Sequence, residues 1–405
     1  MQICVGMRAT RPTEVSMIPN GYKKTEIGVI PLDWEVNTIE NITTYVDYRG
    51  KTPKKIKRGI FLVTARNIKN NIINYSLSSE YIAEEDYETV MSRGKPKLGD
   101  VLLTTEAPLG EIASIDNENI ALAQRIIKYR AIEKYLDNSF LKHYFTSSKF
   151  QDVLLLNATG STVKGIKGSR LKKLKIPLPP LTQQKKIAQI LSTADEKIEA
   201  IALQIEKAEM VKKGLMQRLL SDESWEIKTL DSVATITMGQ SPKSSTYNQE
   251  NIGIPLIQGN ADCKNRKTVP RTYTTELTKE CFVGDIIMTV RAPVGAISKS
   301  LHNACIGRGV CSIKPNEENE FLYHFLVNYE DKWDKLSQGS TFTAVSGSDI
   351  RSIKLFFPPL KEQTKIANIL TTADEKLEVL RAKKAKYEEL KVGLMQKLLT
   401  GEVRV

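Results

Sequence analysis

A long motif occurs twice in this chain and constrains its fold more than any other feature. The first copy, PPLTQQKKIAQILSTADEKIEAIALQIEKAEMVKKGLMQRLLS, runs from Pro179 to Ser221. The second copy, PPLKEQTKIANILTTADEKLEVLRAKKAKYEELKVGLMQKLLT, runs from Pro358 to Thr400, and more than half of the positions match without a gap. A repeat period of about 180 residues indicates a duplicated domain rather than a solenoid of short repeats.

Each copy has the apolar spacing of one long helix, alternating between three and four residues, which is typical of a coiled coil. A helix of roughly 40 residues would be about 60 Å long. The double proline at the start of each copy suits a helix start, and Lys212 and Lys391 interrupt the seam at the same place in both copies. The predicted seam residues are Ile187, Leu191, Ala194, Ile198, Ile201, Ile205, Ala208, Leu215 and Leu219 in the first copy, and Ile366, Leu370, Ala373, Leu377, Leu380, Tyr387, Leu394 and Leu398 in the second.

Two arrangements of these helices are open. Both could be amphipathic helices buried in one core, or each could pair with the other along its seam as an intramolecular rod. Two matched seams favour the rod, because the other copy is the simplest partner for each helix.

The segments before the two helices repeat more faintly. Two pairs of segments correspond. GDVLLTT from Gly99 aligns with GDIIMTV from Gly284, and GSTVKGIKGSRLKKLKI from Gly160 aligns with GSTFTAVSGSDIRSIKL from Gly339. Short β-rich runs that begin at Gly-Asp turns, with helical stretches late in each segment, predict two α+β domains. Trp34 and Trp225 stand near the starts of these domains and are expected to be structural anchors. The predicted segments are a leader (1–20), a first domain (21–178), a first spacer helix (179–221), a second domain (222–357) and a second spacer helix (358–405).

Composition favours a polyanionic partner. The chain has 405 residues, a formal net charge of +12 and a pI of about 9.2, and a basic balance of this size makes nucleic acid the first candidate. Its five cysteines are odd in number and irregularly spaced, which suits reduced thiols and a cytoplasmic location. Neither a signal peptide nor an apolar run of membrane-spanning length is apparent.

The sequence offers no recognisable catalytic constellation. A GxxxxGK[ST] loop and a GxGxxG turn are absent, and the three histidines form no HExxH pair, so we predict neither catalytic residues nor a metal site. Asp195-Glu196-Lys197 and Asp374-Glu375-Lys376 are consecutive on a helix and therefore diverge. They are better interpreted as a solvated face or a partner contact. These absences favour a recognition protein.

Candidate DNA contacts are the basic and amide side chains in the loops that differ between the halves. Lys and Arg neutralise phosphates, whereas Arg, Asn and Gln can read guanine and adenine edges. The loops Gly50–Lys54 and Gly160–Lys167 rank highest, because glycines allow close backbone approach. The candidates are Lys51, Thr52, Lys54, Lys55, Arg66, Asn67, Arg125, Lys164 and Lys167 in the first half, and Gln240, Ser241, Lys243, Gln258, Asn260, Arg291, Arg308 and Thr341 in the second.

The repeated pattern PPLxxQxKIAxIL…TADEK…GLMQxLL, placed after two divergent domains, resembles the specificity (S) subunit of Type I restriction–modification systems. The opening KKTEIGVIPLDWEV and the GDVLLT and GDIIMT blocks also resemble that family. The resemblance implies two target-recognition domains that each read one half of a split double-stranded DNA target. It also implies two spacer helices, packed antiparallel with pseudo-twofold symmetry, that fix the gap.

The same resemblance implies a non-catalytic subunit that directs adenine methylation and DNA cleavage by its partners. Two methyltransferase (M) subunits would carry S-adenosylmethionine, and restriction (R) subunits with ATP- and Mg-dependent activities would join through them. A different class remains open, namely a coiled-coil scaffold or adaptor that binds protein. A specific reader predicts preference for one target and a steep salt dependence, whereas a scaffold predicts neither.

Overall fold

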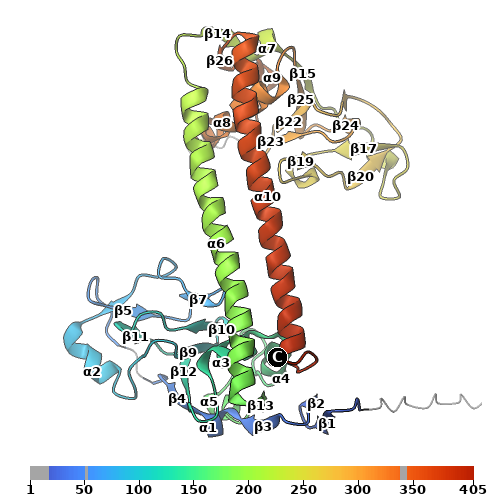
Figure 1. The fold of residues 1–405 in the computed structure, drawn as a ribbon. Coiled ribbons are helices and arrows are strands. Elements are labelled where there is room, and N and C mark those ends of the chain that lie inside the picture. The colour runs from blue at the N-terminus through green and yellow to red at the C-terminus, as the bar shows by residue number, and fades with distance from the viewer. Residues whose placement is uncertain (1–17, 51–52, 338–343) are drawn as a thin grey trace, which may run out of the picture. The chain divides into compact units, whose positions relative to one another are not determined.

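The computed structural model describes residues 18–50, 53–337 and 344–405. The chain divides into two compact units, shown in Figure 1: unit 1 comprises Met1–Ala200 and Ala385–Val405, and unit 2 comprises Ile201–Lys384. Both boundaries fall inside long helices, so each unit contains one globular domain and a part of each helix.

Unit 1 is built on an antiparallel sheet in the order β10-β9-β12-β4 and a smaller sheet in the order β11-β5-β8, in which β5 and β11 run parallel. A strand pair, β3 with β13, closes the domain next to the first long helix. The elements of unit 1 before that helix are β1 (Tyr22–Thr25), β2 (Gly28–Pro31), β3 (Glu35–Thr38), α1 (Ile39–Ile42), β4 (Thr43–Asp47), β5 (Ile60–Val63), β6 (Ile68–Lys69), β7 (Ile72–Ile73), β8 (Tyr81–Ile82), η1 (Glu84–Asp86), α2 (Tyr87–Val90), β9 (Val101–Thr105), β10 (Leu109–Ser114), β11 (Ile120–Leu122), β12 (Ile126–Ala131), α3 (Asn138–Thr146), α4 (Ser148–Leu156), α5 (Gly168–Leu171) and β13 (Lys175–Leu178).

Unit 2 repeats this plan with longer sheets. One sheet has the order β15-β25-β22-β23-β19-β18, and the other has the order β16-β20-β17-β24-β21 with β17 and β24 parallel. The elements of unit 2 between the long helices are β14 (Glu226–Thr229), α7 (Leu230–Val233), β15 (Ala234–Met238), η2 (Ser244–Thr246), β16 (Tyr247–Asn248), β17 (Ile254–Ile257), η3 (Asn260–Asp262), β18 (Cys263–Lys264), β19 (Lys267–Thr268), β20 (Thr272–Thr274), β21 (Glu280–Cys281), β22 (Ile286–Thr289), β23 (Ile297–Lys299), β24 (Ala304–Ile306), β25 (Val310–Pro315), α8 (Asn319–Ser337), α9 (Gly347–Arg351) and β26 (Lys354–Phe357).

The predicted Gly-Asp turns open equivalent strands in the two units. Gly99 (φ 79°) and Gly284 (φ 92°) adopt a left-handed conformation that favours glycine. The following aspartates are buried, and each accepts a backbone N–H from three residues upstream: Asp100 from Lys97 at 2.9 Å and Asp285 from Phe282 at 2.9 Å. The repeated turn therefore fixes where the core strands β9 and β22 begin.

The long helices α6 (Leu181–Leu219) and α10 (Leu360–Leu398) begin directly after the paired prolines, as predicted. A buried glutamine of the repeated motif fixes each start. Gln184 donates to the Pro179 carbonyl at 2.7 Å, and Gln363 donates to the Pro358 carbonyl at 2.9 Å. These bonds satisfy polar groups where the chain turns from strand to helix.

The α+β class and the packing of the two long helices are confirmed, with one refinement. In unit 1, Ile187 and Leu191 of α6 and Leu398 of α10 share a single core with the globular domain, which includes Trp34. In unit 2, the corresponding core contains Met216 of α6 and Leu220, which directly follows this helix, together with Ile366, Ala367 and Leu370 of α10. The predicted seam residues buried in these cores are Ile187, Leu191, Ile366, Leu370 and Leu398, whereas Leu215, Leu219 and Leu394 are only partly buried. Trp225 only lines the edge of the unit 2 core, so it is a weaker anchor than Trp34.

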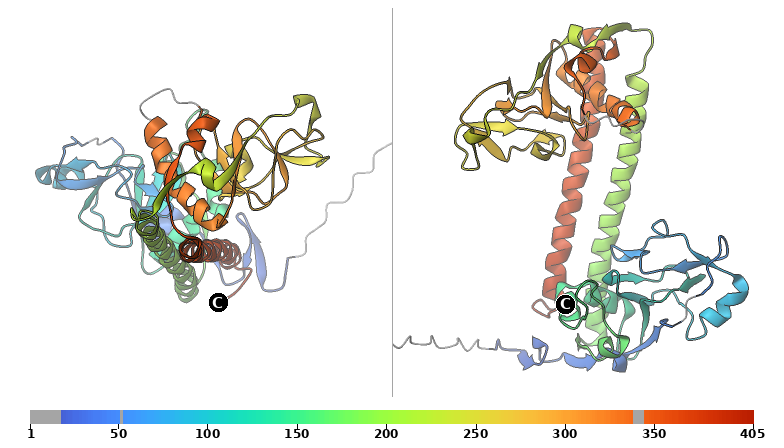
Figure 2. Two further views of the ribbon diagram at one scale, coloured as in Figure 1. Left: turned by 90° about the horizontal axis from the view of Figure 1, so that it is seen from above. Right: turned by 180° about the vertical axis from the view of Figure 1, so that it is seen from behind.

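Within each unit the helices lie side by side (Figures 1 and 2). In unit 2, Glu209 pairs with Arg381 at 2.6 Å and Lys212 pairs with Asp374. The later residue of α6 thus pairs with the earlier residue of α10. This is the antiparallel arrangement. The predicted polar interruptions, Lys212 and Lys391, therefore carry cross-helix ion pairs.

In unit 1, the ion pair belongs to a polar cluster around the buried His143. Lys391 of α10 pairs with Asp195 of α6. His143 of α3 lies 4.0 Å from the same carboxylate through Nδ1, and its Nε2 lies 3.1 Å from the Ser192 hydroxyl. The cluster thus joins three helices, and the partly exposed Asp195 carboxylate is engaged within the chain.

Unit 2 repeats the cluster at equivalent positions. Lys212 of α6 pairs with Asp374 of α10, and Nδ1 of His324 of α8 lies 3.8 Å from that carboxylate. Nε2 of His324 lies 3.3 Å from the Thr371 hydroxyl. The TADEK element of the repeat is therefore explained by the structural role of its aspartate.

Acidification should destabilise both units through these histidines. Burial lowers the pKa of His143 and His324 from 6.5 to about 4, and this outweighs the opposing aspartates. The nearby cations Lys142 and Lys391 lower the His143 pKa further, while those around His324 are Lys212, Lys299 and Arg266. Since the folded pKa lies below the unfolded value, stability is complete above about pH 6.5 and is lost as the pH falls towards 4.

We expect a loss of roughly 1 kcal/mol for each histidine between about pH 7.5 and 5.5, measured from urea unfolding midpoints. The variant carrying His143→Gln and His324→Gln should lose less stability over the same interval. An equal loss in the variant would show that other groups control the acid response.

Candidate nucleic-acid interface

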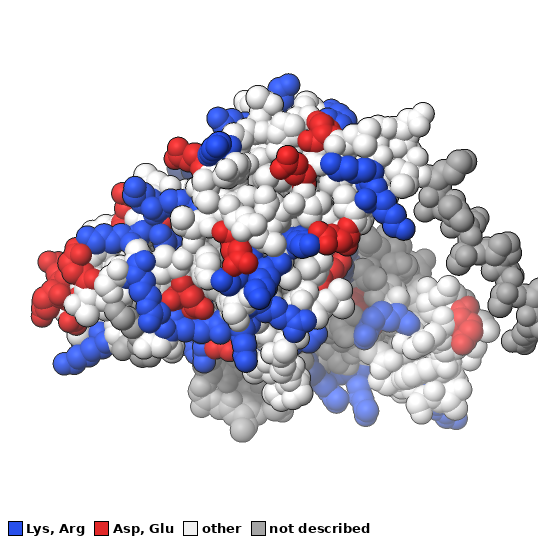
Figure 3. Space-filling view, turned by 90° about the horizontal axis from the view of Figure 1, so that it is seen from below, with Lys and Arg blue, Asp and Glu red and all other residues white. Residues whose placement is uncertain are grey.

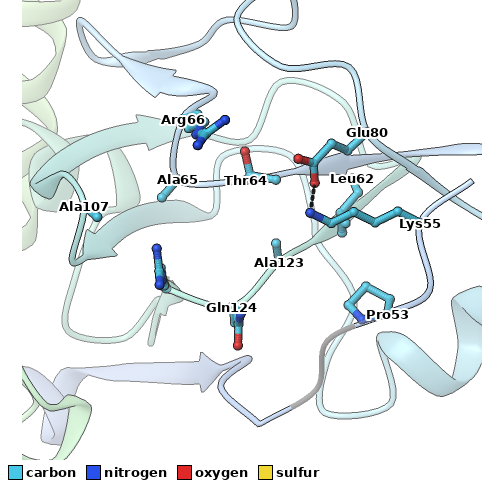
Figure 4. Close-up of a pocket in the computed structure, with 11 residues that line it drawn as sticks. Pro53, Lys55, Leu62, Thr64, Ala65, Arg66, Glu80, Ala107, Ala123 and Gln124 are labelled. Atoms are coloured by element: carbon cyan, nitrogen blue, oxygen red, sulfur yellow. Dashed lines mark ion pairs between the residues drawn. The ribbon is translucent and has the colours of Figure 1, made fainter. Parts of the chain in front are cut away.

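In unit 1, two parallel strands end side by side and lead into the candidate binding loops. β5 and β11 pair in parallel with Val63 opposite Leu122. The chain continues from these strands into Thr64–Arg66 and Ala123–Arg125, which line a cavity of about 400 Å³ (Figure 4). Because the side chains that follow parallel strands meet at one sheet edge, this edge can present residues from two chain segments to one ligand.

Three of the predicted DNA contacts, Lys55, Arg66 and Arg125, line this cavity. Arg66 is exposed, and within the described residues its guanidinium has no ion pair or hydrogen bond. Lys55 pairs with Glu80 at 2.6 Å, and Arg125 pairs with Glu106 at 2.9 Å. Arg66 is therefore the most available cation at this site.

The loop Gly160–Lys167 is held at the end of β9, on the same side as Arg125. Gly165 pairs with both Thr159 and Glu106 through isolated bridges, and the neighbouring Ile166 N–H donates to the Thr105 carbonyl at 3.0 Å. Lys164 and Lys167 are exposed. Their ammonium groups suit contacts with phosphates, which attract flexible point charges.

Asn67 was predicted as a DNA contact, but the structure places it in the core. Its Oδ1 accepts the Thr64 N–H at 2.9 Å, and its Nδ2 donates to the carbonyls of Asn74 at 3.1 Å and Ser78 at 2.8 Å. With its side chain buried and its bonding capacity used, Asn67 shapes the turn after β5 and cannot read a base. Asp262 has the same role in unit 2, where it accepts the Gln258 N–H at 2.8 Å.

Unit 2 gathers its predicted contacts at the equivalent sheet edge. β17 and β24 run parallel with Ile257 opposite Ile306. The Arg308 N–H donates to the Ser241 hydroxyl at 3.1 Å, and the Gln240 N–H donates to the Ile306 carbonyl at 2.9 Å. The exposed predicted residues in this part of the chain are Gln240, Lys243, Gln258, Asn260, Arg291 and Arg308.

Ser241 is partly engaged as an acceptor for Arg308, and Lys54 is exposed in unit 1. Lys51, Thr52 and Thr341 lie outside the residues that the structure describes.

The basic charge is dispersed on the face shown in Figure 3, where Lys and Arg side chains alternate with Asp and Glu. Two candidate cations are also paired, Lys55 with Glu80 and Arg125 with Glu106. Net charge alone therefore identifies the binding edge poorly, and the positions of unpaired polar groups identify it better.

Gln124 was missing from the predicted contacts. It lines the unit 1 cavity between the buried Ala123 and the exposed Arg125, and no described residue bonds to its amide. A signal for it was present, because NIALAQRI from Asn119 aligns without a gap with NACIGRGV from Asn303. In this alignment Gln124 corresponds to Arg308.

Among residues 18–50, 53–337 and 344–405, no group of three or more His, Cys, Asp or Glu side chains could hold a metal ion. None of the helices in those ranges is long and apolar enough to cross a membrane. The cysteines of the described part, Cys263, Cys281, Cys305 and Cys311, are free thiols.

A duplicated framework that presents different amide and cationic side chains at equivalent loop positions defines a recognition protein for nucleic acid. The chain belongs to the type I restriction–modification DNA specificity family, whose domain model matches residues 31–210 and 222–389. It is 34% identical over 419 residues to the putative type I restriction enzyme MjaX specificity subunit of Methanocaldococcus jannaschii, covering 95% of this chain and 97% of that protein. It is also 21% identical to the EcoKI specificity subunit of Escherichia coli, over 93% of this chain and 90% of that protein.

Solved structures share the fold. An S subunit from M. genitalium matches with a TM-score of 0.63 and 17% identity, over 90% of this chain and 96% of that chain. A chain from work on the assembly and conformational transition of a type I restriction–modification system matches with a TM-score of 0.59 and 23% identity, over 92% of this chain and 99% of that one. This chain is thus a DNA-specificity subunit with two recognition domains.

Proposed function

We propose that this chain reads a bipartite DNA target with a fixed gap and directs adenine methylation and DNA cleavage by partner subunits, without catalysing either reaction. The observation that carries this proposal is the pair of sheet edges. Both have the same backbone framework, but Gln124 in one unit corresponds to Arg308 in the other. Two frameworks with different side chains suit two different half-sites.

Two M subunits would bind, one for each copy of the repeat, and R subunits would join through them. Val211 in unit 2 and Leu390 in unit 1 are equivalent positions of the two helices, and both side chains are more than half exposed. One partner that binds twice needs the same apolar feature twice, and exposed apolar side chains on a charged helix suit a protein contact. S-adenosylmethionine, ATP and Mg would be held by these partners, and the buried thiols suit a reducing cytoplasm.

The test is a methylation map. This chain would be co-expressed with the M subunit encoded beside it, and modified adenines would be located by long-read sequencing. We expect a split motif of two short half-sites around a constant gap, which disappears when this chain is omitted. If M is soluble and active but methylation does not depend on this chain, the proposal fails and a protein-binding scaffold becomes the better explanation.

The helices should set the gap. α6 and α10 are continuous over 39 residues each. Deleting Ala202–Ile205 together with the equivalent Arg381–Lys384 removes about one turn from each helix and should shorten the gap by roughly one or two base pairs, since a turn rises about 5.4 Å and a base pair about 3.4 Å. Replacing the same residues with alanine, without changing the length, is the control and should leave the gap unchanged. An unaltered gap after the deletion would refute a ruler.

A further inference from the structure

We propose that Gln124 and Arg308 are base-reading residues, with Gln124 recognising an adenine in one half-site and Arg308 recognising a guanine in the other. This inference rests on the proposed bipartite function and assigns its specificity to one equivalent position in the two units. The glutamine amide can make a bidentate contact with adenine N6 and N7, and the guanidinium can do so with guanine O6 and N7.

The backbone on both sides of this position is fixed identically in the two units. On the preceding side, the Ala123 N–H donates to the Val63 carbonyl at 2.9 Å and the Gly307 N–H donates to the Ile257 carbonyl at 2.8 Å. These bonds extend the parallel ladder past the last paired residue. Each side chain therefore starts from the end of an ordered strand rather than from a free loop.

On the following side, the carbonyls of Arg125 and Gly309 are also held. They accept the Thr105 N–H at 2.8 Å and the Val290 N–H at 2.9 Å, respectively. A Cβ added at Gly309 would lie 2.1 Å from the Gln258 carbonyl oxygen, so this backbone is closely packed. A binding side chain between two fixed peptides loses less conformational entropy when it engages a ligand.

Both side chains are available. Within the described residues, neither the Gln124 amide nor the Arg308 guanidinium has a hydrogen bond or ion pair, whereas nearby Arg125 and Lys55 are paired with carboxylates. Gln124 is half-buried in the cavity, and hydrogen bonds from a base edge to its unbonded amide would stabilise the complex. Gln124 and Arg66 both line this cavity, as labelled in Figure 4.

Charge distinguishes this position from the phosphate contacts. Gln124 is neutral and cannot neutralise a phosphate charge, whereas the donor and acceptor of its amide match the N7 and N6 groups of adenine. Lys164 is exposed on a neighbouring loop and has a freely rotating ammonium group, which suits the phosphate backbone. The two residues therefore make opposite predictions about sequence dependence.

The experiment uses the full chain in complex with its M subunit. Binding would be measured on duplexes that carry the methylated motif of the wild type, and on duplexes with each base pair of the motif substituted in turn. Gln124→Ala should weaken binding to the cognate duplex roughly 5- to 150-fold and abolish discrimination at one adenine position of one half-site. Arg308→Ala should do the same at one guanine position of the other half-site.

Lys164→Ala is the matched control. It should weaken binding to every duplex by a similar factor and reduce the salt slope by about one. Gln124→Ala should only abolish discrimination at the adenine position, whereas Gln124→Arg should shift the preference there from adenine towards guanine. If an alanine variant fails to fold, Gln124→Met and Arg308→Met, which keep most of the side-chain volume, replace it.

Unchanged discrimination at all motif positions in folded variants would overturn the inference, as would a uniform loss on all duplexes like that of Lys164→Ala. Failure of the proposed function gives a different result, because the wild-type complex would then produce no bipartite motif at all. A wild-type motif that the variants leave intact thus refutes the base-reading role alone.

Discussion

Exchanging residues 21–178 for the corresponding domain of another type I specificity subunit is expected to replace one half of the methylated sequence and leave the other half and the gap unchanged. Unit 1 has its own core and its own candidate binding edge, and the second domain lies wholly in unit 2. The methylated motif of the hybrid, read by long-read sequencing, measures the result.

The reciprocal exchange of residues 222–357 is the matched control and should alter only the other half. The incoming domain must supply a histidine equivalent to His143, because this side chain contacts Ser192 and the Asp195 carboxylate on α6. A hybrid that is stable but changes both half-sites would show that the two domains do not read DNA independently.

Removing the aspartate of the buried cluster in unit 2 should have the largest effect on stability. Asp374→Ala leaves the Lys212 ammonium, whose side chain is 12% exposed, without its counter-ion. Breaking a buried pair by deleting one partner costs about 3–5 kcal/mol, and the partial exposure of Asp374 reduces the expectation to about 2–3 kcal/mol. Urea unfolding monitored by circular dichroism measures the loss.

A double variant separates the ion pair from general damage. Lys212→Met removes the unpaired charge and should restore part of the stability lost in Asp374→Ala, because the remaining side chain is apolar. The adjacent Glu375→Ala is the control, since Glu375 is exposed and should change stability by less than about 0.5 kcal/mol. If Asp374→Ala lost no more stability than Glu375→Ala, the Lys212 ammonium would have to reach solvent at little cost in free energy.

Local regularities made much of the fold predictable. Apolar spacing identified the long helices, because burial along a helix follows its 3.6-residue turn. The double prolines marked the helix starts at Leu181 and Leu360, and the Gly-Asp turns marked the starts of β9 and β22. Each of these signals lies within a few residues of the feature that it predicts.

The candidate site was less predictable, because solvent exposure of a polar loop residue depends on distant contacts. Asn67 follows Arg66 in the same polar segment, and the sequence predicted both as DNA contacts. The Asn67 amide is nevertheless bonded to the backbone carbonyls of Asn74 and Ser78. Gln124 has no charge and was not among the predicted contacts, although the parallel pairing of β5 and β11 brings it into a cavity with Arg66. Residue type selects basic side chains as candidate DNA contacts. Whether such a side chain is free to bind DNA depends on whether another residue of the chain already pairs with it.

The sequence by itself determined the duplication, the two α+β domains, the long helices and the family, since all of these are written in repeated or periodic residues. Only the tertiary structure decided what the polar residues of the repeat do. Lys391 and Asp195 are far apart in the chain, and they pair because the helices run antiparallel in unit 1. A periodic pattern records which side of a helix is buried, but the partner of a buried charge depends on how two helices are aligned, and no local pattern encodes that alignment.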